Sequence, residues 1–136
     1  DGLMDWRQWL YDQLTSNAAL TAVVQVADIR ASGSLKAPPS RKPYIVIRTG
    51  AETEELNDGD APLVTSQSAT IWIHDEPGSF DRIDSILALV RDALIGAVTS
   101  PNGIACIWQG NSGELADASL GTITRNSSFR LVGSVA

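Results

Sequence analysis

The chain of 136 residues has the length of one domain, and its 43% apolar and 19% charged residues exclude the low-hydrophobicity composition of disordered proteins. A net charge of -6 argues against binding nucleic acid by neutralising phosphates, which needs a cationic surface. The single cysteine, Cys106, excludes an intrachain disulfide, and neither a signal-peptide core nor an apolar run of about 18 residues is present. We therefore expect residues 1–136 to form a single soluble domain, made in a reducing cytosol.

The first expected element is an amphipathic helix over residues 5–16. Asp5 and Gln8 have the spacing of a capping box, and tryptophans and leucines then recur at helical spacing. The short run at residues 18–26 is ambiguous between a helical turn and a strand. We favour a turn or a short helix, followed by a strand near residues 28–31.

The middle of the chain predicts a hairpin. Residues 30–43 hold prolines, serines and a glycine and predict a long loop, after which PYIVIRTG, residues 43–50, predicts a strand. The run TSQSATIWIHD, residues 65–75, alternates apolar and polar side chains as a half-buried strand does. We expect these two strands to pair in antiparallel fashion around an oversized acidic loop.

A second helix and further strands complete the expected order. Residues 79–96 have a broad apolar stripe, with Ser79 as the N-cap and Gly96 as the stop. PNG predicts a turn before a strand at residues 104–110, and residues 122–135 predict one long bulged strand or two short strands. This order lacks regular βαβ alternation, so the expected fold is α+β, an antiparallel or mixed β-sheet with two main helices packed on one face.

Motifs for chemistry are scarce. His74, Asp75 and Glu76 are adjacent at a strand end and point in different directions, so they do not form a nucleophile-activating relay by themselves. The stretch NDGDAP resembles the first half of a calcium loop without the glutamate that completes it, and no phosphate-binding or zinc motif occurs. We assign no catalytic, cofactor-binding or metal-binding residue and expect no cofactor. The four tryptophans are expected in core or interface packing.

Charge is distributed in two blocks of opposite sign that border one expected strand. The basic block has no acid and consists of Arg30, Lys36, Arg41, Lys42 and Arg48. The acidic block has no base and consists of Glu52, Glu54, Glu55, Asp58 and Asp60. One interpretation is two solvated loops that attract each other modestly within a subunit. The other is a subunit whose basic loop meets the acidic loop of a neighbour, a head-to-tail contact that closes a ring.

The layout resembles the phage tail terminator family, also called tail-completion or minor tail proteins, of long non-contractile tails. The resemblance rests on WLYDQLTSNAALTAVV, on PYIVIR after the Pro-rich loop, on ATIWIHDEPGSFDRIDSILALVRDAL and on ITRNSSFRLVGS. It spans most of the chain as one tail-terminator-like domain, and is a likeness of element order and hydrophobic pattern.

The resemblance implies a structural virion protein that is not an enzyme. Such a subunit forms a ring, typically a homohexamer, on the head-proximal end of the tail tube, stops tube polymerisation and provides the surface for head joining. Its implied partners are further copies of itself, the tail tube protein and head-tail connector proteins, with DNA passing through the lumen without specific binding and with no membrane. The implied location is the virion tail, assembled in the cytoplasm of a host bacterium. Under this reading the acidic block faces the lumen or a basic surface of the neighbouring subunit.

Two alternatives stay open at this point. A head-tail connector or neck protein would share the size, the acidity and the ring. A small ligand-binding module or enzyme of ferredoxin-like type would use His74 with Asp75 or Glu76 at a sheet edge.

Overall fold

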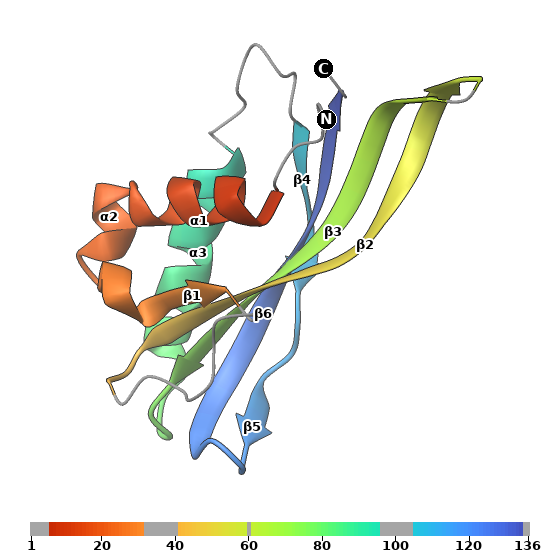
Figure 1. The fold of residues 1–136 in the computed structure, drawn as a ribbon. Coiled ribbons are helices and arrows are strands. Elements are labelled where there is room, and N and C mark those ends of the chain that lie inside the picture. The colour runs from red at the N-terminus through yellow and green to blue at the C-terminus, as the bar shows by residue number, and fades with distance from the viewer. Residues whose placement is uncertain (1–5, 32–40, 60, 96–104, 135–136) are drawn as a thin grey trace.

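A computed structural model describes residues 6–31, 41–59, 61–95 and 105–134 of the chain (Figure 1). Helices cover one face of a single twisted sheet, and one hairpin of that sheet extends well beyond the helices (Figure 1). In the part of the chain described, no helix has both the length and the apolar character needed to cross a membrane.

The helical layer contains two main helices, α1 (Trp6–Thr15) and α3 (Asp81–Ile95). Along the chain, α1 is followed by the short helix α2 (Ala18–Thr21) and by the 3-10 turn η1 (Val26–Asp28), which leads into the first strand. Helix α2 begins at Asn17, whose side chain accepts a hydrogen bond from the Leu20 backbone N–H at 3.0 Å and so satisfies a free donor of the first turn. The expected first helix, the short helix after it and the second main helix are therefore confirmed, while Asp5 and Gly96 lie outside the described residues.

The sheet is mixed, with strand order β1-β2-β3-β6-β4, and β5 pairs with β6 away from this path. Strand β1 runs parallel to β2, and the remaining pairs are antiparallel. The strands are β1 (Ile29–Ala31), β2 (Tyr44–Asp58), β3 (Ala61–Asp75), β4 (Ala105–Asn111), β5 (Leu115–Asp117) and β6 (Thr122–Ser134). The predicted fold class, an α+β domain with both main helices on one face of the sheet, is confirmed (Figure 1).

The core lies between the helices and the half of the sheet that the helices cover. Apolar side chains at alternate positions of β2, β3 and β6 pack against the stripes of α1 and α3, because successive residues of a strand point to opposite faces. Trp6 and Trp9 are buried in this core and Trp108 packs against it, which confirms packing roles for these three tryptophans. Trp72 lies outside the core cluster, on the opposite face of the sheet.

Ion pairs hold α3 against the sheet at two places. Arg82 of α3 donates through Nε and Nη2 to the carboxylate of Asp75, which is almost fully buried at the end of β3. Arg125 of β6 reaches Asp84 at 2.6 Å. These pairs help to fix the rotation of α3 about its axis and its position along the apolar face of the sheet.

Two sequence predictions are wrong in their boundaries, and one strand was not predicted. The acidic stretch is not a loop, because residues through Asp58 continue β2, and the hairpin turns only around Gly59. The expected loop over residues 30–43 begins too early, since Arg30 and Ala31 belong to β1. The polar segment after β4 contains β5, which was not predicted. The closing run is one continuous strand, the first of the two alternatives predicted for it.

Candidate functional site

The first feature of the candidate site is the hairpin arm, which we define as residues 49–58 of β2, the turn after them and residues 61–69 of β3. It is the pale yellow-green end of the hairpin that stands clear of the helices in Figure 1. Between Arg48 and Arg82 the sequence contains no Lys or Arg, and Glu52, Glu54, Glu55 and Asp58 of the acidic block belong to β2. Of that block, Asp60 lies outside the described residues.

The arm departs from regular pairing at defined places. The β2–β3 register shifts between Thr49 and Glu52, between Glu54 and Leu56 and between Leu56 and Asn57. An extra residue in one strand bends it and increases its twist, so these bulges set the direction in which the arm leaves the body. On its far edge, β2 pairs with β1 only through residues 45–47, and no strand pairs with that edge further along within the described part of the chain.

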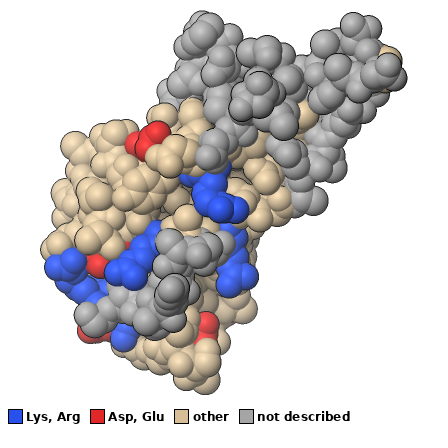
Figure 2. Space-filling view, in the orientation of Figure 1, with Lys and Arg blue, Asp and Glu red and all other residues tan. Residues whose placement is uncertain are grey.

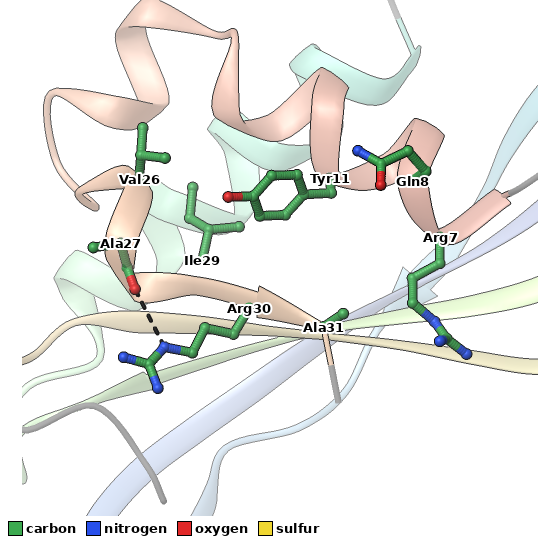
Figure 3. Close-up of a pocket in the computed structure, with 8 residues that line it drawn as sticks. All are labelled: Arg7, Gln8, Tyr11, Val26, Ala27, Ile29, Arg30 and Ala31. Atoms are coloured by element: carbon green, nitrogen blue, oxygen red, sulfur yellow. Dashed lines mark hydrogen bonds between the residues drawn. The ribbon is translucent and has the colours of Figure 1, made fainter. Parts of the chain in front are cut away.

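The second feature is a groove between the helical layer and the sheet edge, which we call the α1–β1 groove. It is a hollow of about 640 Å³ lined by Arg7, Gln8 and Tyr11 of α1, by Val26 and Ala27 of η1, and by β1 (Figure 3). Tyr11 points from α1 towards Val26 and Ile29, while Arg7 and Arg30 lie on its strand side (Figure 3). The described lining therefore combines an apolar floor with two guanidinium groups and no carboxylate.

The two arginines of the groove are positioned by hydrogen bonds. Arg7 Nη2 lies 3.5 Å from Thr49 Oγ1, at the root of the hairpin arm. Arg30 Nε donates to the carbonyl oxygen of Ala27 at 3.2 Å (Figure 3).

The structure distributes the predicted basic residues around the β1–β2 edge rather than in one loop. Arg30 lines the groove, and Arg48 lies on the outer face of the sheet, the face opposite the helices, beside Trp72 and His74. Arg41 pairs with the buried carboxylate of Asp28 of the same chain at 2.8 Å, and its own side chain is 54% exposed. Lys42 is partly buried before β2, and Lys36 lies outside the described residues. Figure 2 shows several separate patches of Lys and Arg side chains on this side of the molecule.

Sequence reasoning missed Arg7. It sits at an exposed position of α1, next to two buried tryptophans, and its spacing marks it only as part of the polar face of a helix. Its place beside β1 follows from the packing of α1 on the sheet, which a helical pattern does not specify.

The outer face carries a second, smaller hollow of about 280 Å³, lined by Val46, Arg48, Trp72, His74, Asp117 and Leu120. His74 is buried and its Nδ1 lies 2.9 Å from Thr122 Oγ1. Burial lowers the pKa of His74, the charge of Asp117 opposes this, and Arg48 adds to the lowering. The imidazole is therefore neutral near neutral pH.

The dyad of the enzyme alternative is not assembled. His74 faces Thr122 on the outer face, whereas the Asp75 carboxylate turns to Arg82 on the helical side and accepts the Glu76 backbone N–H at 2.7 Å. Strand β3 also lies inside the sheet between β2 and β6, so the expected position at a sheet edge is wrong. In the described residues no three His, Cys, Asp or Glu side chains converge as metal ligands would.

The described residues form an α+β fold with a mixed sheet and a projecting hairpin, and this fold has solved counterparts. A chain from the virion of a native gene transfer agent particle has the same fold, with a TM-score of 0.67 and 18% sequence identity over 92% of this chain and 91% of that chain. The bacteriophage SPP1 gp17 protein aligns over 100% of this chain and 97% of its own, with 14% identity and a TM-score of 0.47. No family model and no curated protein matches the sequence.

Proposed function

We propose that this protein is a structural subunit of a phage-type virion that forms a ring, a homohexamer, on the head-proximal end of the tail tube. The observation that carries the proposal is the fold shared with a chain of a gene transfer agent virion over nearly the whole length of both chains. The proposed position, at the head-proximal end of the tail, is based on the resemblance of the sequence to tail terminators.

The proposed mechanism is steric. One face of the ring matches the last ring of the tube, and the other face lacks the surface on which another tube ring adds, so polymerisation stops and the connector proteins of the head bind there. No covalent bond forms or breaks. The edge of β2 that no strand of the described residues pairs with, and the unbalanced charge of the arm's sequence, favour a role in assembly, because an exposed strand edge is a template for pairing with another chain.

The lumen of such a ring passes DNA. We propose that the acidic block of the hairpin arm faces either this lumen, where carboxylates repel phosphates, or a basic surface of the neighbouring subunit. Both placements require an arm that leaves the body of its own subunit, as β2 and β3 do in Figure 1.

The oligomeric state tests the proposal first. Light scattering after size-exclusion chromatography should give a hexamer of 14.5-kDa subunits, about 87 kDa, whose population decreases as salt screens the charged contact. Purified tail tube protein with this protein added should give shorter tubes, with the ring at one end in electron micrographs. A protein that stays monomeric and leaves tube length unchanged would contradict the proposal. Binding to portal-side proteins and not to tubes would instead favour the connector alternative.

A further inference from the structure

We propose that the open edge of β4 in one subunit pairs with the open edge of β2 in the next subunit, so that the sheet continues across the subunit boundary. An open edge is here the side of a strand that no described strand pairs with. The inference rests on the proposed ring, and it names the contact that closes it.

The two open edges lie on opposite sides of the sheet. Within the described residues, β4 is the last strand of the order and pairs only with β6. At the other end of the sheet, β1 covers β2 through residues 45–47, and from Arg48 onward the described partner of β2 is β3 alone. The sheet between the two edges is open, so one chain does not bring them together (Figure 1). A contact between them needs two copies and is head-to-tail.

The two edges also lie at the same height in the sheet. Followed through the paired positions of β3 and β6, the row of Arg48 reaches Gly110 of β4. The row of Thr53 reaches Ala105 in the same way. Strand β1 ends beside Ile47, below these rows, so it does not stand between two copies placed side by side at equal height. Three antiparallel steps separate β2 from β4, so the new pair is antiparallel as well.

The two edges have matching lengths. Between the same two rows the inner strands have five residues each and the outer strands have six each: 66–70 of β3, 128–132 of β6, 48–53 of β2 and 105–110 of β4. The extra residue accounts for the register shift after Thr49 in β2 and for the shift after Trp108 in β4. An extra residue in only one of two paired strands disrupts their ladder. Because both edges contain one, they can pair over the whole stretch.

The residues of β4 favour pairing. Ala105–Asn111 contain no charged residue and no proline, which are the residues that commonly keep an edge strand from pairing with another chain. Trp108 packs against the core, so its neighbour Ile107 lies on the face opposite the helices, where its side chain is 45% exposed. Pairing with the next subunit would cover this isoleucine and remove apolar surface from water.

Charge substitutions at Ile107 test the contact. In the proposed pairing this side chain lies diagonally opposite Arg48 of the next subunit, within reach of a long side chain. Ile107→Glu and Ile107→Lys both remove the isoleucine, but only the lysine repels Arg48. The dissociation constant of the Ile107→Lys ring should therefore be about fivefold or more above that of the Ile107→Glu ring. Adding Arg48→Glu to both variants should reverse this order. Asp92→Lys, at an exposed position of α3, is the control and should leave assembly unchanged.

Hydrogen exchange locates the contact without any substitution. Backbone amides at an open strand edge exchange readily with solvent, and a new ladder protects them. Mass spectrometry of the assembled ring and of the diluted monomer should show slower exchange in the ring for residues 48–53 and for residues 105–110. Residues 81–95 of α3 are the control, because their amides are already bonded within the helix. Circular dichroism of every variant shows whether it has folded.

The outcomes separate the two proposals. A ring in which neither edge gains protection, and in which Arg48→Glu does not reverse the order of the Ile107 variants, would overturn the edge contact and keep the ring. Open filaments with both edges protected would support the contact and overturn the closed ring. A dimer with only β4 protected would overturn both, because β4 would then pair with its own copy. A chain that remains monomeric with and without tubes would also overturn both.

Discussion

Tyr44 and His74 face each other across β2 and β3, with ring centroids 4.8 Å apart and an angle of 10° between their planes. Trp72 extends the stack, at 6.4 Å from His74. The Thr122 hydroxyl forms a hydrogen bond with Nδ1 of the His74 imidazole. The only histidine of the chain is therefore enclosed on the outer face by two aromatic rings and a hydroxyl group.

This environment predicts a stability that depends on pH through one residue. Burial lowers the pKa of His74 below its usual 6.5, so in acid the unfolded chain binds a proton that the folded chain does not. The free energy of unfolding should therefore decrease as pH falls below 6.5, and continue to decrease until the folded pKa is reached. Urea unfolding of the wild type and of His74→Gln at several pH values measures this.

The neutral variant His74→Gln is the control for the dependence of stability on pH. His74→Gln has no titratable group at this position, so its stability should change less than that of the wild type between neutral pH and the onset of carboxylate titration. Equal slopes in the two proteins would show that the imidazole titrates alike in the folded and unfolded states.

The Asp75–Arg82 pair predicts a second stability effect. Burial alone would raise the pKa of Asp75, but the hydrogen bonds from Arg82 and from the Glu76 N–H outweigh it and lower the pKa. Arg82→Ala leaves a carboxylate at 4% exposure without the two N–H donors of the guanidinium. We expect a loss of about 1–2 kcal/mol, below that of fully buried pairs because Arg82 is 48% exposed.

Thermal or urea unfolding of Arg82→Ala measures this loss, with Asp92→Ala, a change at an exposed position of the same helix, as the control. Since the pKa of Asp75 is lowered, the stabilisation from the pair is present above the unfolded value of 3.8 and lost as pH falls through the folded pKa. A variant as stable as the wild type at neutral pH would mean that water replaces the arginine without cost.

Gly50 predicts a coupled effect at the root of the arm. A Cβ added there would lie 2.1 Å from Ser68 Oγ, so Gly50→Ala forces the serine hydroxyl to move. We expect Gly50→Ala to destabilise the protein by about 1 kcal/mol. In a Ser68→Ala background the clash disappears, and the same change should be neutral or stabilising, since alanine loses less backbone entropy than glycine. A double-mutant cycle measures the coupling, and additive effects would contradict it.

Cys106 predicts low thiol reactivity. Burial raises its pKa to about 12, so at about pH 8 the thiolate fraction falls roughly a thousandfold below that of a thiol with the usual value. Iodoacetamide should modify the native protein correspondingly slowly and the urea-unfolded protein at the ordinary rate, with Cys106→Ser as the blank. Fast modification of the native chain would show that β4 opens readily.

Periodicity was sufficient to predict the elements of the core. The stripes at Trp6 and Trp9 and along α3, and the alternation over Ile71 and Ile73, reflect burial on one face, and burial is what the structure shows. These patterns depend on side chains close together in sequence, so no tertiary information was needed.

The acidic half of β2 could not be predicted in the same way. Asp, Asn, Gly and Glu are unfavourable in strands, and the bulges after Thr49 and Glu54 break the two-residue period, so the sequence favours a loop. Pairing with β3 overrides both signals. The α1–β1 groove was equally hidden, because Arg7 and Arg30 come from separate elements that only tertiary packing brings together.

The place of β6 in the sheet has a consequence for how the chain folds during its synthesis. It comes after every other element along the chain, yet it lies between β3 and β4 and also binds β5. While the chain is being synthesised, β3 therefore waits with one side unpaired, and β4 and β5 have no strand to join. Long-range pairing of this kind slows folding and leaves an edge open to other nascent chains. A newly made chain is thus most vulnerable to aggregation just before its last strand enters the sheet.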